Sequence, residues 1–314
     1  MLRRAFAVAA AALALPSMAG AVPLAGGTAY ADPAARNGRV MLQWGDRMVT
    51  YSAHGTDRRD LGVGTDPKYS PDGRTVAYTV AGNIHLMNAD GTGKRVLTSG
   101  PRKDNNPAWS PDGTRLVFSS APTADRTQRS LWVITIATGA TRRLTARNDG
   151  CAFDPVWAAT GRYVVYVDAC PAGGSLVRSV RRVDVATGAV GTIVPAGGLT
   201  FAGGRYKLNN SRVDLTPDGT RVVWSAMDVN EEESEDGGIA EVRLDGSGAR
   251  WVDFLYFYWV YGPPVVSPDG RTVIYSYGIE NAQIDSSCRV TGCEMFYLDT
   301  PELWPEAADW QPVR

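Results

Sequence analysis

The chain has 314 residues, of which 44% are hydrophobic and 21% are charged, and its formal net charge is −1. This length allows one large domain with a full hydrophobic core or two modest ones, and the composition is that of an ordinary globular protein. A nearly neutral chain has no positive excess to attract a polyphosphate, so nucleic-acid binding is excluded as its role.

The first 31 residues have the pattern of a signal peptide. The basic Leu2-Arg3-Arg4 precedes an apolar run from Ala5 to Leu15, and Ala29-Tyr30-Ala31 supplies small residues for cleavage. A membrane anchor would need about 20 apolar residues in a row, and Pro16 interrupts this run. We therefore expect an exported chain without a membrane span after cleavage, either secreted or held at the cell envelope.

Residues 32–37 are expected to be a short leader, and residues 38–314 one domain built on a repeat. The turn sequence Ser/Thr-Pro-Asp-Gly begins at Ser70, Ser110, Thr216 and Ser267, and a degenerate copy begins at Ala158. Proline presets φ at the second turn position and glycine permits a left-handed exit, so each copy predicts a hairpin turn. A β-branched strand follows each glycine.

Each turn lies between two predicted strands, and two more short strands follow after tight turns such as Asp90-Gly91-Thr92-Gly93. Each unit is therefore expected to be a four-stranded antiparallel sheet of about 47 residues, a usual length for a propeller blade. The third strand of the last unit is expected at Met295–Leu298, which leaves little chain for its outer strand. Six second strands are predicted, beginning at Arg39, Arg74, Thr114, Arg162, Thr220 and Arg271.

The two ends of the domain carry the halves of one unit. The segment Gly38–Leu42 repeats the second-strand phrase without a first strand before it, and Ala308–Pro312 repeats the first-strand phrase. Because an open sheet edge invites aggregation, we predict that the strand through Trp310 pairs with the strand that starts at Arg39. The predicted fold is an all-β, six-bladed β-propeller of four-stranded antiparallel blades, closed by the C-terminal strand.

An aromatic residue, Ser-Pro-Asp-Gly and a β-branched strand follow one another at Tyr69–Tyr78 and at Trp109–Phe118. This phrase resembles the WD-like repeats of TolB-type propellers, and the resemblance covers nearly all of the chain after residue 31. It implies a six-bladed ring, frequently exported, that commonly serves as a protein-binding platform. We expect no counterpart of the separate N-terminal domain of TolB, so its role in the Tol-Pal system is not carried over.

Four cysteines in an exported chain favour disulfide bonds. Cys151 and Cys170 flank the hairpin centred near Ala159, and antiparallel pairing would place them almost opposite each other. We therefore pair these two, which leaves Cys288 and Cys293 to close a short loop.

No pattern in the sequence indicates catalysis. A Gly-x-Ser-x-Gly nucleophile elbow is absent from the sequence. The only two histidines, His54 and His85, fall in or beside predicted strands, which also disfavours a zinc site. The aspartates of the repeated turns are explained by the turns themselves. We therefore predict that the protein is not an enzyme.

The alternative is a calcium-dependent hydrolase or lyase with a metal at the propeller axis. Lactonase-like six-bladed propellers hold calcium there, and calcium takes six to eight oxygen ligands. Asp and Asn are also common in loops for conformational reasons, so we expect no cofactor and keep calcium as the alternative. The candidate ligands on one face are Asp104, Asn105, Asp149, Asp154, Asn209 and Asn210.

Long insertions are predicted only in connections that emerge on one face of a propeller, between second and third or fourth and first strands. Long loops on a rigid scaffold usually carry binding. These insertions are residues 121–129, 196–210, 227–237, 253–262 and 278–293.

Two of the insertions flank the fifth unit and stand out by composition. One is acidic and contains Glu231, Glu232 and Glu233, and the other is the aromatic stretch Phe254–Tyr261. Alternation along a strand cannot bury all these rings on one side, so some of the residues Tyr256, Tyr258 and Trp259 are expected to form an exposed aromatic patch.

The predicted function is that of an exported, non-catalytic scaffold. We expect a monomer that holds an unidentified protein or glycan on its long-loop face, because aromatic anchors dominate contact energies.

Overall fold

The computed structural model describes residues 37–52, 56–122, 128–146, 151–172, 175–229, 237–255, 259–260, 264–278, 283–288 and 307–312. The chain divides into two compact units, Met1–Asp32 and Pro33–Arg314. The predicted signal peptide and leader lie outside the described residues except for Asn37, and all described strands belong to the second unit. The described residues of this unit form 25 strands in six sheets, without an α-helix.

The first sheet joins the two ends of the unit. Its strand order is β25 (Ala307–Pro312), β1 (Asn37–Trp44), β2 (Arg47–Tyr51) and β3 (Arg59–Val63). Strand β25 pairs antiparallel with β1, and Trp310 lies opposite Val40. The predicted closure by the C-terminal strand is confirmed.

Three further sheets follow in chain order, each a four-stranded antiparallel meander with the strand before the repeated turn at one edge. The first of them contains β4 (Thr65–Tyr69), β5 (Thr75–Val80), β6 (Asn83–Asn88) and β7 (Arg95–Val96). The next contains β8 (Lys103–Trp109), β9 (Arg115–Ala121), β10 (Ser130–Thr135) and β11 (Thr141–Arg143). The third contains β12 (Ala152–Trp157), β13 (Tyr163–Ala172), β14 (Ser175–Asp184) and β15 (Val190–Val194).

The fifth sheet has one strand more than predicted. The insertion expected at residues 196–210 forms a hairpin that extends the sheet, because β16 pairs with the first part of β17. The order is β16 (Leu199–Phe201), β17 (Gly204–Leu215), β18 (Arg221–Asp228), β19 (Gly237–Arg243) and β20 (Arg250–Leu255).

The sixth sheet departs from the predicted pattern. Two short strands, β21 (Trp259–Val260) and β22 (Val265–Val266), pair with different parts of β23 (Thr272–Gly278), and β24 (Gln283–Cys288) also pairs with β23. The third strand is therefore β24, and its prediction at Met295–Leu298 was wrong. The polar sequence of β24 lacks the apolar alternation by which a strand is recognised. Five sheets form complete blades against the six predicted, and a complete sixth blade stays a prediction.

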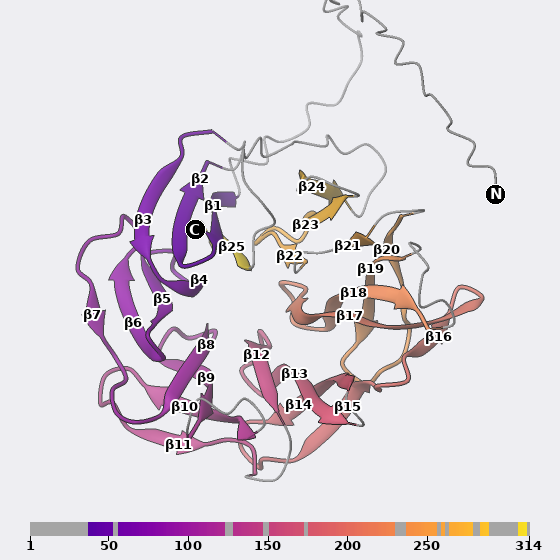
Figure 1. The fold of residues 1–314 in the computed structure, drawn as a ribbon, viewed down its shortest axis with the longest axis horizontal. Helices are drawn as coiled ribbons and strands as arrows, with labels where there is room; N and C mark the ends of the chain where they lie inside the picture. Colours follow the sequence, from indigo (N-terminus) through magenta and orange to yellow (C-terminus); the bar gives the residue numbers. More distant parts are fainter. Residues whose placement is uncertain are drawn as a thin grey trace, which may run out of the picture. The chain divides into compact units, whose positions relative to one another are not determined.

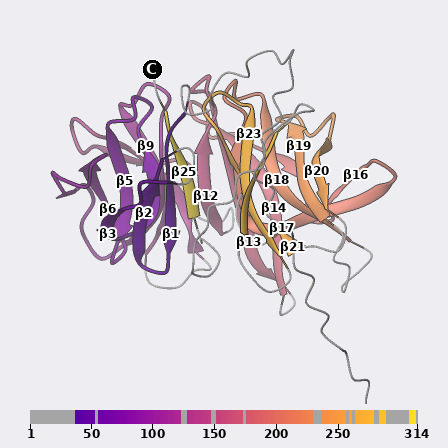
Figure 2. The ribbon, with the colours of Figure 1, turned by 90° about the horizontal axis from the view of Figure 1, so that it is seen from above.

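The innermost strands of the sheets meet in a closed circle. Contacts run from β25 to β4, β8, β12, β17 and β22, and from β22 back to β25. Figure 1 shows the sheets of this unit set around a common centre, and Figure 2 shows the strands running across the thickness of the ring. The chain therefore brings one equivalent strand from each sheet to the same axis.

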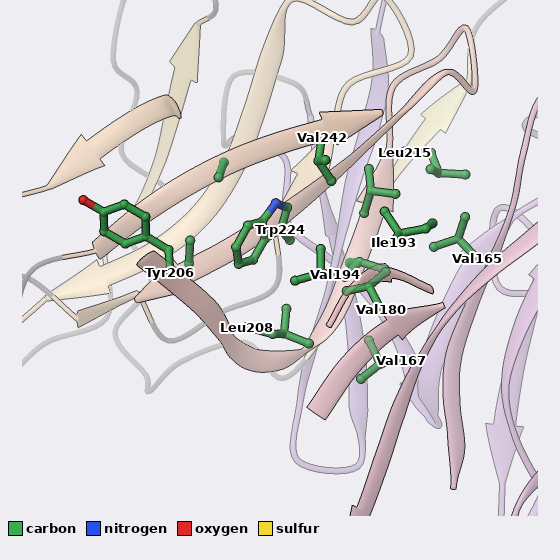
Figure 3. Packing of buried hydrophobic residues seen from close by; sticks show 14 of the residues in the cluster. Val165, Val167, Val180, Ile193, Val194, Tyr206, Leu208, Leu215, Trp224 and Val242 are labelled. Atoms are coloured by element: carbon green, nitrogen blue, oxygen red, sulfur yellow. The ribbon is translucent and has the colours of Figure 1, made fainter. Parts of the chain in front are cut away.

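Hydrophobic side chains fill the space between neighbouring sheets. The largest cluster lies between the sheet that starts with β12 and the sheet that starts with β16 (Figure 3). Trp224 is fully buried there, with Val165 and Val180 from one sheet and Leu208 and Val242 from the other. Alternation along each strand places these residues on the faces that meet.

The repeated turns have the predicted local chemistry. In the first copy the Ser70 hydroxyl donates to Asp72 Oδ1 at 2.5 Å, and the same carboxylate oxygen accepts the backbone N–H of Arg74 at 3.1 Å. The aspartate is thus used within its own turn, as expected. Gly73 has φ +69°, and a Cβ there would lie 2.3 Å from the carbonyl oxygen of Pro312 in the adjoining blade. Glycine is needed for both the conformation and the close approach.

Three innermost strands share one irregularity. Asp66, Asn106 and Asp154 each precede a proline and have φ values of 52°, 52° and 44°. The register with the second strand shifts at each of these places. Because a bulge re-aims the side chain of its extra residue, three consecutive blades present a short polar side chain at an equivalent position.

Candidate functional site

The innermost strands and the repeated turns surround a funnel at the axis, which we call the axial funnel. Its volume is about 280 Å³. Each of the six innermost strands contributes to its wall, so it belongs to the ring as a whole. The wall contains aromatic side chains, Tyr69, Trp109, Trp157 and Trp310, and prolines, Pro71, Pro111, Pro217, Pro268 and Pro312.

Charged side chains lie at the base of the axial funnel. The ammonium of Lys68 contacts the Asp309 carboxylate at 3.2 Å, and these side chains keep 22% and 17% of their surface exposed. Asp309 also accepts the backbone N–H of Tyr69 at 2.7 Å, and Asp214 accepts that of Val266 at 2.7 Å. The three side chains occupy the same position in the repeat. Lys68 and Asp214 are the last residue but one of β4 and β17, and Asp309 precedes Trp310, which corresponds to Tyr69. They meet because equivalent positions lie at one level of the axis.

The surroundings at the bottom of the funnel shift the pKa values of Lys68, Asp214 and Asp309. Loss of hydration raises the pKa of Asp214 to about 6, against the opposing effect of Lys68. The same loss raises the pKa of Asp309, although Lys68 opposes it. Loss of hydration lowers the pKa of Lys68, but nearby carboxylates, led by Asp309, outweigh it and leave this pKa raised. The lysine is held charged while both carboxyl groups are harder to ionise than usual.

A second polar layer comes from the bulged positions. The Arg212 guanidinium contacts Asp66 at 2.6 Å and Asp154 at 3.1 Å, and the Asn106 amide donates to Asp66 at 2.9 Å. Burial raises the pKa of Asp154 despite the arginine. Residues of four blades are therefore joined through hydrogen bonds and ion pairs. With the residues at the funnel base, the axis holds four carboxylates and two cationic side chains.

Comparison with known proteins agrees with this architecture. A family model described as the TolB beta propeller domain matches residues 58–196. The crystal structure of TolB from Acinetobacter baumannii superposes with a TM-score of 0.67, covering 88% of this chain and 67% of that chain at 17% identity. The chain has a TolB-like β-propeller. At that identity the superposition concerns the fold alone.

Curated relatives match only parts of this TolB-like propeller. A protein named TolB homolog from Chlorobium luteolum is 35% identical over 110 residues, which are 34% of this chain and 23% of the relative. A protein named uncharacterized peptidase YuxL from Bacillus subtilis is 30% identical over 122 residues, 36% of this chain and 18% of the relative. The chain thus spans less than a quarter of the length of either relative.

The described members of the predicted calcium-ligand set lie on β8, β12 and β17. Asp154 lies at the axis, where Arg212 supplies the positive charge beside it. Asp104 lies in β8, and its Oδ1 accepts the Ser120 hydroxyl at 2.6 Å. Asn105 is also in β8, Asn209 and Asn210 are in β17, and Asp149 lies outside the described residues. The described part of the TolB-like propeller contains no group of three His, Cys, Asp or Glu side chains suited to a metal; calcium at the axis stays the alternative hypothesis.

Most of the predicted long-loop site lies outside the described residues, namely Glu231, Glu232, Glu233, Tyr256 and Tyr258. The backbone of the aromatic stretch is partly strand, since Phe254 and Leu255 end β20 and Trp259 begins β21. The exposed aromatic patch stays a prediction.

The predicted cysteine pair is brought together. The sulfur atoms of Cys151 and Cys170 are 2.6 Å apart. A covalent bridge between them stays a prediction. Cys288 ends β24, and Cys293 lies outside the described residues.

His85 lies in β6 and packs within the second blade. The His85 ring packs 5.5 Å from the Tyr78 ring in the second blade, and burial lowers the pKa of His85. His54 lies outside the described residues.

Over the described ranges, no helix is both long and apolar enough to cross a membrane.

Proposed function

We propose that this chain is an exported, non-catalytic scaffold whose axial funnel binds a segment of a protein partner. The observation that carries the proposal is the funnel itself, with apolar aromatic and proline walls above a charged base. Sites of this kind combine apolar contact area with a few placed polar groups. The repeated turns that line the funnel lie on the face of the ring opposite the predicted long loops. The proposal therefore adds this face, which we call the tight-turn face, to the long-loop face favoured by the sequence.

The charge at the axis indicates what the segment carries. Lys68 and Arg212 face four carboxylates, and the carboxyl groups of Asp214 and Asp309 border the funnel. Ionised above a pH of about 6, Asp214 adds to a negative excess that a lysine or arginine of the partner would neutralise. We therefore expect a basic side chain at the base of the funnel and apolar neighbours along its walls.

Other observations support the remaining parts of the proposal. The signal-peptide pattern of residues 1–31 supports export. The lining of the funnel contains no histidine or cysteine among the described residues, so it supplies neither an imidazole base nor a thiol nucleophile. Relatives named TolB fit a scaffold without catalysis.

A variant that plugs the funnel tests the proposal. Ala159 lies exposed at the rim in place of a turn proline, so Ala159→Trp should fill the mouth without disturbing the core. Displayed peptides selected on the wild-type chain should bind the Ala159→Trp variant at least about tenfold more weakly, a loss of about 1.4 kcal/mol.

The matched control is Ala189→Trp, an exposed alanine in the tight turn between β14 and β15 on the same face. It should leave peptide binding unchanged, and the selected peptides should be rich in lysine or arginine. Equal binding to all three proteins would place the binding surface elsewhere, with the long-loop face as the next candidate.

A further inference from the structure

A second recessed region lies between the blades that contain β4–β7 and β8–β11, away from the axis. Its main cavity is about 280 Å³ and an adjoining one is about 140 Å³. Arg102 and Ser120 line both, Arg143 lines the smaller, and Trp132 lines the larger. We call this region the interblade pocket. It shares no lining residue with the axial funnel.

Two guanidinium groups are held against one indole in the interblade pocket. The guanidinium carbon of Arg102 is 4.3 Å from the centroid of the Trp132 ring, and that of Arg143 is 5.2 Å from it. Trp132 and Arg143 lie directly opposite each other in the β10–β11 pairing. An arginine stacked on an aromatic face loses mobility but keeps its N–H donors available at the edge of its plane.

Neither arginine has an acidic partner among the described residues. Ion pairs are present for Arg39, Arg47 and Arg59, for example, but not for Arg102 or Arg143. The one described hydrogen bond of Arg102 goes to the Ser120 hydroxyl at a long 3.4 Å. Two cations so close to one ring repel each other, and an anion between them would relieve this repulsion.

The remaining lining indicates more than a simple anion. Thr98, Ser99, Thr141 and Asp104 also line the larger cavity, and Ser130 lines the smaller. The Thr98 hydroxyl accepts the backbone N–H of Ile84 at 2.9 Å, and the Asp104 carboxylate accepts the Ser120 hydroxyl at 2.6 Å. A volume of about 280 Å³ lies just below the usual range of ligand pockets, roughly 300–1,000 Å³. A ligand matched to this lining carries a carboxylate for the arginines and several hydroxyls, and it is small.

We propose that the interblade pocket binds an acidic sugar, with the sugar carboxylate between Arg102 and Arg143 and the sugar hydroxyls toward the serine and threonine side chains. Guanidinium forks match a carboxylate in a bidentate manner, which a lysine cannot do. The proposal rests on different residues from the axial funnel, so either can fail alone.

Titration calorimetry of the full chain with D-glucuronate tests this proposal, with D-glucose and acetate as comparison ligands. Glucuronate should bind, glucose should not, and acetate should bind at least about tenfold more weakly than glucuronate. The Arg143→Ala and Arg102→Ala variants should each lower glucuronate affinity about tenfold or more, since each removes a charge-assisted contact worth about 1.4 kcal/mol. Arg143→Lys should recover only part of the loss.

The matched control is Arg95→Ala, an exposed arginine of β7 that does not line the interblade pocket. It should bind glucuronate as the wild type does. Absence of glucuronate binding would overturn the proposal. So would glucuronate binding by the Arg102→Ala and Arg143→Ala variants that is as tight as that of the wild type. Acetate binding as tight as that of glucuronate would overturn the choice of a sugar. The Ala159→Trp variant should bind glucuronate normally, which separates this pocket from the funnel.

Discussion

The axis and the periphery of the ring are built from the same repeat but differ in how their charges are partnered. At the axis, Arg212 bridges Asp66 and Asp154, whose side chains are only 10% and 11% exposed. At the periphery, the Arg59–Asp57 pair is more than half exposed on both sides. Exposed pairs contribute little because water competes and salt screens them, whereas breaking a buried pair strands a charge. Stability should therefore depend on the ion pairs of Arg212 far more than on an exposed pair such as Arg59–Asp57.

The largest expected effect comes from removing residues 305–314. This deletion takes away β25, which pairs with β1 and carries Asp309 to the axis. The edge of β1 would be unpaired and Lys68 would lose its partner, so we expect unfolding or aggregation. Thermal unfolding measured by circular dichroism, with removal of residues 313–314 alone as the control, checks this. A truncated chain that melts like the wild type would contradict closure by β25.

Arg212→Ala should be the most damaging single substitution among the axial charges. It removes the guanidinium that pairs with both Asp66 and Asp154, and a fully buried pair broken in this way costs roughly 3–5 kcal/mol. Because Arg212 keeps 21% of its side-chain surface exposed, we expect a loss on the order of 2–3 kcal/mol.

Urea unfolding of Arg212→Ala measures this loss. Arg95→Ala on an outer strand should change stability by less than about 0.5 kcal/mol. Adding Asp66→Asn and Asp154→Asn to Arg212→Ala should recover most of the loss, since no charge then stays unpaired. Equal effects of Arg212→Ala and Arg95→Ala would remove the distinction between axis and periphery.

The third prediction is a disulfide between Cys151 and Cys170 in the oxidised, exported protein. Each thiol loses a proton and the pair gives two electrons to an external oxidant, which closes a loop of about 20 residues worth on the order of 3 kcal/mol. Peptide mapping without reductant should recover the two cysteines in one linked peptide, and reduction should lower the melting temperature. Linkage of either cysteine to Cys288 or Cys293 would contradict the pairing.

The smallest expected effect is a difference in pH dependence at Asp214. Burial raises its pKa to about 6, so the folded state favours the protonated form, and that stabilisation is lost as the pH rises through about 6. Lys68 and Asp309 are the charged neighbours, and they are the same in both proteins. Relative to the wild type, Asp214→Asn should therefore gain on the order of 1–2 kcal/mol between pH 4 and pH 7.

A peripheral carboxylate should show the opposite sign. Hydrogen bonds from the Ser247 side chain and backbone lower the pKa of the exposed Asp245. Asp245→Asn should lose relative stability as the pH rises through the range where Asp245 ionises. Unfolding free energies of both variants at a series of pH values check the contrast, and parallel curves would contradict it.

The sequence predicted the frame of the ring better than its centre. Repeated turns such as Ser70-Pro71-Asp72-Gly73 locate hairpins because their chemistry is local, and the unmatched half-units at Arg39 and Trp310 indicated the closure. The charges at the axis come from residues far apart in the chain. Lys68 and Asp309 are separated by 241 positions, and only the folded ring shows that they meet.

A positional signal for the axial charges was nevertheless present in the repeat. Asp66 and Arg212 stand four residues before the first residue of their turns, and Lys68 and Asp214 stand two residues before it. Aligning the units on their turns would have placed each pair at one level of the axis. The interblade pocket gave no such signal, because Trp132 and Arg143 meet through a cross-strand pairing and Arg102 approaches from the connection between two blades.

The pairing of Asn37 with Pro312 places the two ends of the ring side by side. Every blade then has two neighbours. The position of the chain termini decides only which blade comes first in the sequence. A circular permutant that links residue 312 to residue 37 and opens at an exposed turn, such as the one around Gly139, should fold to the same ring.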